Sequence, residues 1–269
     1  MARKLSLAYL TIFDADPVSA VRIAAETGYD MVGLRLLPSS PGEVLYPLMT
    51  DDALLREVAV ALRDTGVEMG DVEIARLGAQ TDVAAFTPFF ERAARLRARH
   101  VLVAGDDPDE RRLADSFAAL ARLAASFDLT VDLEFMPWTQ VRDLAAARRI
   151  VEAAGEPNGG VLVDALHWDR AKSTAAEVRD LPRNRVNYVQ LCDGPAHYDP
   201  SDEGLIAVAR GARLNPGEGG IDLHALAAAI PADATVSVEV PNRERAQTVD
   251  ARRRAADALA ATRAILAGR

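Results

Sequence analysis

Eight short apolar runs recur along the chain, and a helix-like segment follows each of them. The runs lie at 4–10, 30–36, 67–74, 100–104, 129–135, 160–164, 186–192 and 235–240. The segments between and after them, near 17–27, 51–65, 82–97, 109–126, 139–154, 174–180, 222–229 and 245–267, show the apolar spacing of amphipathic helices. Runs such as VLVA and GVLVD are almost continuously apolar, which is typical of parallel strands buried on both faces.

Eight repeated strand–helix units predict an α/β fold, a single closed (β/α)8 TIM barrel over residues 1–269. The length suits this fold, because such barrels commonly have about 250 residues. An open doubly wound sheet is the competing arrangement, but the turn FDADPVSA after the first strand lacks its glycine-rich fingerprint. The one long irregular stretch, 193–221, follows the seventh strand, at the end where barrels build active sites.

Composition and charge exclude several classes of protein. The net charge is −9, and the basic run at 252–254 falls in a helical pattern, so no nucleic-acid partner is expected. No segment approaches the ~20 apolar residues of a membrane span, and the N-terminal apolar run is read as the first strand. Cys192 has no partner for an internal disulfide and is expected to be a buried packing residue. We therefore expect a cytoplasmic protein that binds a small-molecule substrate.

Each of the last four predicted strands ends in a residue with a metal-binding oxygen. They are Glu134 in TVDLEF, Asp164 in GVLVDALHW, Gln190 in VNYVQLCD and Glu239 in TVSVEVP. Neighbouring barrel strands bring their carboxyl ends within reach of one ion. Three carboxylates and one amide oxygen form a hard site that favours Mg²⁺ or Mn²⁺, with Co²⁺ or Zn²⁺ as alternatives.

Five further residues are candidate substrate contacts. His167 lies three residues after Asp164, where it can contact substrate oxygens. Arg210 and Arg213 precede PGEGG and can clamp a carboxylate or phosphate, or else pair with acids on the surface. The remaining two, Arg35 and Glu73, lie at the ends of the second and third strands, facing the same mouth.

With these residues in hand, the chain resembles the xylose isomerase-like TIM-barrel superfamily of sugar phosphate isomerases and epimerases. The resemblance rests on the series Glu134, Asp164 with His167, Gln190 and Glu239 and covers nearly the whole chain. It implies that Glu134 and Glu239 are both metal ligands and acid/base groups, and that His167 holds a substrate oxygen. Epimerases of this superfamily often have His where this chain has Gln190, whereas members similar to hydroxypyruvate isomerase or 3-dehydroshikimate dehydratase have Gln.

The expected activity is that of a metal-dependent isomerase or epimerase of a small ketose, sugar phosphate or hydroxy keto acid. A carboxylate would remove the proton next to a metal-bound carbonyl group. Loss of a β-hydroxyl group instead would make the protein a lyase of the dehydroshikimate dehydratase type. The third hypothesis is a non-catalytic barrel that binds a metabolite. Dimers or tetramers are common in families like this one, so a homo-oligomer is one of the expected quaternary states.

Overall fold

The chain folds into a closed barrel of eight parallel strands, in a computed structural model that describes residues 3–40 and 42–268. Each strand pairs with the next along the chain, and β8 returns to β1 through pairs such as Leu7 with Val238. This connectivity confirms the predicted (β/α)8 fold. The strands are β1 (Leu5–Leu7), β2 (Met31–Arg35), β3 (Glu68–Leu77), β4 (His100–Gly105), β5 (Thr130–Glu134), β6 (Gly159–Asp164), β7 (Tyr188–Leu191) and β8 (Thr235–Val238).

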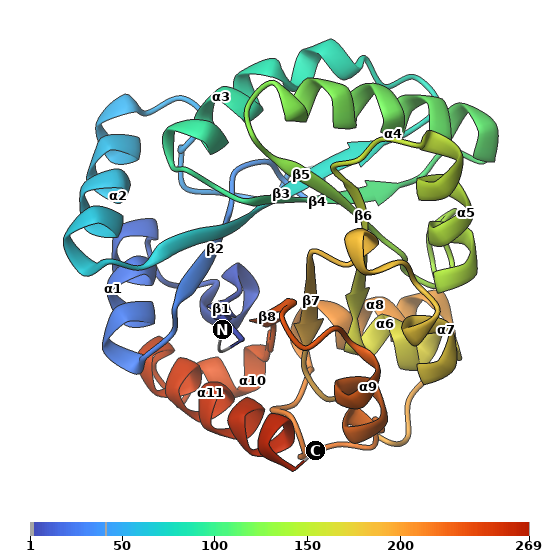
Figure 1. Cartoon of the computed structure of the whole chain (residues 1–269). Helices are drawn as coiled ribbons and strands as arrows, with labels where there is room; N and C mark the ends of the chain where they lie inside the picture. The colour runs from blue at the N-terminus through green and yellow to red at the C-terminus, as the bar shows by residue number, and fades with distance from the viewer. Residues whose placement is uncertain (1–2, 41, 269) are drawn as a thin grey trace.

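Helices surround the barrel on its outer side (Figure 1). The α-helices are α1 (Pro17–Thr27), α2 (Asp52–Thr65), α3 (Thr87–Arg95), α4 (Glu110–Ala125), α5 (Leu144–Ala154), α6 (Ala165–Arg170), α7 (Ala175–Arg179), α8 (Asp202–Gly211), α9 (Leu223–Ala229), α10 (Arg243–Ala246) and α11 (Ala251–Ala267). Three 3-10 helices, η1 (Tyr9–Ile12), η2 (Val83–Phe86) and η3 (Arg183–Arg185), lie in the connections. No helix within the described ranges is long and apolar enough to cross a lipid bilayer.

Aspartates begin most of the longer helices. The Asp16 carboxylate accepts hydrogen bonds from the backbone N–H groups of Val18 and Ser19, and Pro17 occupies the first position of α1. This helix ends at Thr27 and is capped by Gly28, whose φ of 89° suits glycine. The aspartates that cap α2, α4, α5, α9 and α11 in the same way are Asp51, Asp109, Asp143, Asp222 and Asp250. Part of the acidic composition therefore fixes where the helices begin.

The apolar core has two parts. The larger part lies between the strands and the helices and contains Phe89, Phe90 and Phe117. The smaller part consists of Ile74, Leu102, Ala104, Met136, Leu162 and Tyr188. Cys192 belongs to the larger part and is fully buried, as predicted.

Two buried aspartates, Asp71 and Asp132, give the strands a polar component. Asp132 accepts hydrogen bonds from Thr130 Oγ1 and Asn187 Nδ2, each at 2.8 Å, and burial raises its pKa to about 7. Neither carboxylate oxygen of Asp71 has a hydrogen-bond partner among the described residues, and burial, followed by the nearby Glu73, raises its pKa well above the usual value. In the folded protein, Asp71 therefore favours the protonated form, and Asp132 does so below about pH 7.

Several predicted boundaries are wrong. The first strand covers only Leu5–Leu7, because the chain turns into η1 where a strand to residue 10 was expected. The predicted helix 139–154 begins only at Leu144, where Asp143 caps it. The stretch 193–221 is not irregular throughout, since it contains α8, which Ser201 caps. Helix α6, directly after β6, was not predicted from the sequence.

Candidate active site

Polar side chains occupy the carboxyl ends of four neighbouring strands. Glu134 ends β5, Asp164 ends β6, Gln190 lies near the end of β7 and Glu239 directly follows β8. Strand register pairs Asp164 with Gln190, and the backbone N–H of Glu239 donates to Leu191 at the end of β7. All four side chains are buried. The structure thus brings the four predicted metal ligands to one end of the barrel.

Glu134, Asp164 and His167 form the tightest cluster of possible ligands. Each offers one ligand atom, and these atoms lie within 4.8 Å of one another. His167 Nε2 is 3.7 Å from Glu134 Oε1 and 3.8 Å from Asp164 Oδ1. The Asp164 carboxylate also caps α6 by accepting a hydrogen bond from the backbone N–H of His167 at 3.0 Å. This cap turns the chain so that His167 faces the strand ends, where its ring lies nearly perpendicular to that of Trp138, with the ring centroids 5.0 Å apart.

Gln190 and Glu239 form the second half of the site. Gln190 Nε2 donates to Glu239 Oε1 at 3.0 Å. The amide oxygen of Gln190 is buried and has no hydrogen-bond partner in the described part of the chain. A buried carbonyl oxygen without a partner is costly in a folded protein, and a bound cation is one way of satisfying it.

Arg213 lies between the two halves. Its Nη1 donates to Asp164 Oδ2 at 2.6 Å, and its Nη2 lies 2.9 Å from Glu239 Oε2. Its Nε donates to the carbonyl oxygen of Ala209. The predicted substrate clamp is therefore buried and bound to two of the predicted metal ligands.

The surroundings raise the pKa of two carboxyl groups of the site and lower the pKa of a third. Burial raises the pKa of Glu239 to about 8, despite the opposing charge of Arg213. Burial and then the neighbouring Asp164 raise the pKa of Glu134 well above its usual value. The pKa of Asp164 is lowered, because Arg213 and His167 more than offset its burial. Burial lowers the pKa of His167 to about 4, so its ring is neutral at neutral pH.

This donor set fits a divalent cation. The buried carboxylates of Glu73, Glu134, Asp164 and Glu239 outnumber the two buried guanidinium groups that pair with them, those of Arg35 and Arg213. When ionised, the site therefore carries surplus negative charge away from water, which a cation would neutralise. Carboxylate and amide oxygens are the donors that hard divalent cations prefer.

A cavity of 360 Å³ opens onto this cluster. Six of the predicted site residues line it: Arg35, Glu134, His167, Arg210, Arg213 and Glu239. Asp164, Gln190 and Glu73 are buried behind its wall. Arg35 and Glu73 bind each other, with Arg35 Nε donating to Glu73 Oε2 at 3.0 Å. Arg35 nevertheless lines the cavity, and Glu73 Oε1 has no hydrogen-bond partner among the described residues, so their role as substrate contacts stays a prediction.

Residues outside the predicted set also shape the mouth. Glu43, in the loop between β2 and α2, accepts from Arg35 Nη1 at 2.9 Å and from the Ser39 backbone N–H. The buried Asp193 carboxylate accepts hydrogen bonds from the N–H groups of Gly194, Gly217, Gly219 and Ile221. The glycine-rich PGEGG turn was the available signal for Asp193, because N–H groups of such a turn have no partner in a helix or strand and need another acceptor where they are buried.

Known sequences identify the family to which most of the chain is similar. Residues 21–265 match the family model of the xylose isomerase-like TIM barrel. The chain is 30% identical over 139 residues to a 3-dehydroshikimate dehydratase of Pseudomonas aeruginosa. That alignment covers 48% of this chain but only 20% of the dehydratase, which is a much longer protein.

Two solved structures share the fold along almost their whole length. The IolI protein, in a structure with a bound zinc atom, superposes with a TM-score of 0.81 at 18% identity, covering 98% of each chain. A D-psicose 3-epimerase, in a structure determined in the presence of D-fructose, gives a TM-score of 0.74 at 15% identity, covering 98% of this chain and 99% of the epimerase. At these identities the likeness establishes the fold.

Proposed function

Because the chain belongs to the xylose isomerase-like TIM-barrel family, we propose that it is a metal-dependent isomerase or epimerase of a small hydroxy carbonyl compound. The observation that carries this proposal is the pair of buried glutamates, Glu134 and Glu239, that line one cavity. They come from the ends of β5 and β8, so they approach the cavity from different parts of the barrel. Two such groups can remove a proton next to a carbonyl group and return it elsewhere.

The surroundings of the two glutamates suit proton transfer near neutral pH. The pKa of Glu239 is raised to about 8, and that of Glu134 is raised as well, both mainly through burial. A carboxyl group whose pKa lies near the working pH can accept a proton and give it back. The neutral His167 is available to hold a substrate oxygen through a hydrogen bond, and Trp138 fixes its ring from the side.

Glu134, Asp164, Gln190 and Glu239 would hold the cation, with His167 beside them. When bound, a divalent cation stabilises the negative charge that develops on the substrate as the proton leaves. The oxygen-rich donor set favours Mg²⁺ or Mn²⁺. The imidazole of His167 is also a suitable ligand for Co²⁺ or Zn²⁺. The apolar wall formed by Ile74, Leu102, Met136 and Trp138 limits access of water to the reacting groups.

Arginines at the mouth favour an anionic substrate. Arg210 and Arg243 line the cavity, and the side chain of neither has an ion pair or hydrogen bond with another described residue. A guanidinium group binds carboxylate or phosphate through two parallel hydrogen bonds. A hydroxy keto acid or a sugar phosphate is therefore the substrate class that best matches this cavity.

A dehydratase is the second candidate. The sequence similarity to a 3-dehydroshikimate dehydratase and the arginine-lined mouth both favour it. Its first step would be the same proton removal by a buried glutamate, after which a β-hydroxyl group leaves as water. The two candidates therefore differ in the fate of the substrate after the proton has left.

Solvent deuterium exchange followed by NMR tests this proposal. The protein would be incubated in D₂O with Mn²⁺ or Mg²⁺ and with ketoses, their phosphates, hydroxypyruvate or 3-dehydroshikimate. We expect deuterium next to the carbonyl group and the signals of an isomer for one anionic substrate. A conjugated or aromatic product from 3-dehydroshikimate would support the dehydratase instead. Absence of exchange from every compound by the metal-loaded protein would contradict both and leave a non-catalytic binding barrel.

Matched variants assign the exchange to the two glutamates. Glu134→Gln and Glu239→Gln keep the shape of the side chain but remove the proton acceptor, so each should slow exchange by about 10²–10⁴-fold. Glu152→Gln makes the same change on α5, where the side chain is exposed and pairs with Arg148. This control should leave the exchange rate unchanged.

A further inference from the structure

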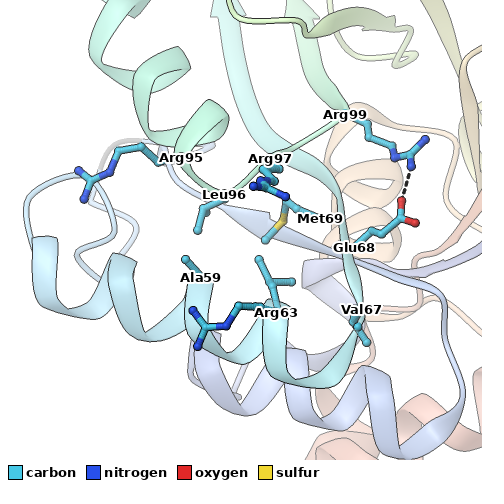
Figure 2. Close-up of a pocket in the computed structure, with 11 residues that line it drawn as sticks. Ala59, Arg63, Val67, Glu68, Met69, Arg95, Leu96, Arg97 and Arg99 are labelled. Atoms are coloured by element: carbon cyan, nitrogen blue, oxygen red, sulfur yellow. Dashed lines mark hydrogen bonds and ion pairs between the residues drawn. The ribbon is translucent and has the colours of Figure 1, made fainter.

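A second cavity lies at the end of the barrel opposite the candidate active site. Its volume is 590 Å³, larger than the 360 Å³ of the active-site cavity. Figure 2 shows it between α2, the start of β3 and the turn that joins α3 to β4. Buried apolar side chains form its floor, namely Leu62, Val67, Met69 and Leu96. The proposed reaction makes no use of this end of the barrel.

Arginine is the main charged residue type on the rim of this cavity. Arg63, Arg95, Arg97 and Arg99 line it, whereas Glu68 is the one acid among its described lining residues. This excess of positive charge belongs to a chain whose net charge is −9. A concave patch of positive charge attracts anionic ligands, even on a protein whose net charge is negative.

Arg97 is the guanidinium group most available to a ligand. In residues 3–40 and 42–268, its side chain has no ion pair and no hydrogen bond. Its backbone has a φ of 55°, which is uncommon for a residue with a side chain. Arg99, by contrast, pairs with Glu68, and Arg95 pairs with Asp52 at 2.9 Å.

Arg63 is the second group that a ligand can recruit. Its Nη2 lies 3.0 Å from Asp64, but both side chains are well exposed, at 69% and 60%. Exposed ion pairs contribute little to stability, so Arg63 can exchange Asp64 for another anion at small cost. Arg63 and Arg97 come from α2 and from the turn after α3, on two sides of the same apolar floor (Figure 2).

We propose that this cavity binds a small organic phosphate, with the phosphate groups at Arg63 and Arg97 and an apolar or ring-shaped part on the floor. Guanidinium groups bind phosphate oxygens in a fixed two-pronged geometry. A floor of Leu, Val and Met favours a ligand with apolar surface over inorganic phosphate alone. The site is separate from the metal centre, and its ligand is not the substrate of the proposed reaction.

Calorimetric titration with ADP, pyrophosphate and adenosine tests the proposal. We expect saturable binding of ADP, weaker binding of pyrophosphate, no binding of adenosine, and loss of ADP affinity as salt is raised. Failure of ADP and pyrophosphate to bind at concentrations up to about 5 mM would overturn the proposal. Equal affinity for ADP and pyrophosphate would overturn the role of the apolar floor. Tighter binding of a single-stranded oligonucleotide than of ADP would overturn the assignment to a small molecule.

Two variants with the same loss of charge locate the site. Arg97→Asn removes the guanidinium group and tolerates a positive φ, so the turn should persist and ADP affinity should fall at least about tenfold. Arg56→Gln removes an exposed arginine of α2 that does not line the cavity, and should change ADP affinity less than about twofold. Equal effects of the two variants would show general charge attraction and overturn the proposed site. Unchanged circular dichroism would confirm that Arg97→Asn folds.

Discussion

Arg213 shows how a single residue can set the state of the candidate active site. Its guanidinium group touches both Asp164 and Glu239, which are also proposed cation ligands. Arg213 holds Asp164 Oδ2 and Glu239 Oε2, so the other oxygen of each carboxylate is not bound to it. The positive charge of Arg213 nevertheless repels a cation bound to the same two carboxylates.

Replacing Arg213 by Met should increase cation affinity. The variant removes the competing positive charge and its ion pairs with Asp164 and Glu239, so we expect Mn²⁺ to bind about tenfold more tightly. Electron paramagnetic resonance of free Mn²⁺ measures this directly. Arg210→Met, which changes an exposed arginine of the same cavity, is the control and should have little effect. Weaker Mn²⁺ binding by a folded Arg213→Met protein would show that Arg213 supports the cation site.

The segment after β7 is the element that positions Arg213. Leu214 pairs with Asp193 through two backbone hydrogen bonds of 2.9 Å, and the neighbouring Ala212 bridges to Asn242 beyond β8. The Asp193 carboxylate holds the turn that follows by accepting four backbone N–H groups. One buried acid thus connects the end of β7 to the chain segment that carries Arg213.

Asp193→Ala should destabilise the protein strongly. Four backbone N–H groups, of which those of Gly194 and Ile221 are buried, would lose their acceptor, so we expect the free energy of unfolding to fall by about 3 kcal/mol or more. Urea denaturation measures this change. The exposed Asp180→Ala is the matched control and should lie within about 0.5 kcal/mol of the wild type. A similar small change in Asp193→Ala would mean that water replaces the carboxylate without cost.

Sequence patterns predicted which strands and helices form better than they predicted the residues at which these begin and end. The apolar runs identified all eight strands, because buried parallel strands need continuous apolar sequence. The first strand was predicted too long, since η1 is as apolar as the strand before it. Helix α8 was missed because DPSDEG at its start is typical of a turn, although Ser201 acts there as its cap.

At the site, strand-end residues were predictable and their partners were not. Glu134 and Asp164 end their strands, and this position in a barrel fixes where they point. The pairing of Arg35 with Glu73, and of Arg213 with Asp164, joins residues that are far apart in sequence. Such contacts depend on the closed barrel and on the segment after β7, for which no local pattern exists.

For the whole molecule, buried acids make stability depend on pH. The pKa values of Glu239 and Asp132 are raised to about 8 and about 7. Their contribution to stability is therefore complete below the usual carboxyl pKa and is lost as the pH rises through 7 and 8. His100 and His167, with pKa values lowered to about 3 and about 4, act in the opposite sense, but only below about pH 6.5.

The metal-free protein should accordingly melt at a lower temperature at about pH 8.5 than at about pH 6.5. We expect a decrease in Tm of about 3 °C or more, measured by differential scanning calorimetry after treatment with a chelator. Saturating Mn²⁺ should reduce this decrease, because a bound cation favours the ionised carboxylates in the folded state. A Tm that rises over this range would show that the buried acids are ionised in the metal-free protein.

Titration of the metal-free protein with Mn²⁺ in a calorimeter tests most directly whether the strand ends form one cation site. We predict one Mn²⁺ per chain, with release of protons, since carboxyl groups with raised pKa values must ionise to bind it. Glu134→Gln and Asp164→Asn should each weaken binding by about 100-fold or more, whereas Glu152→Gln should not. Absence of binding, or equal affinity in all these proteins, would contradict a metal centre at the ends of β5 to β8.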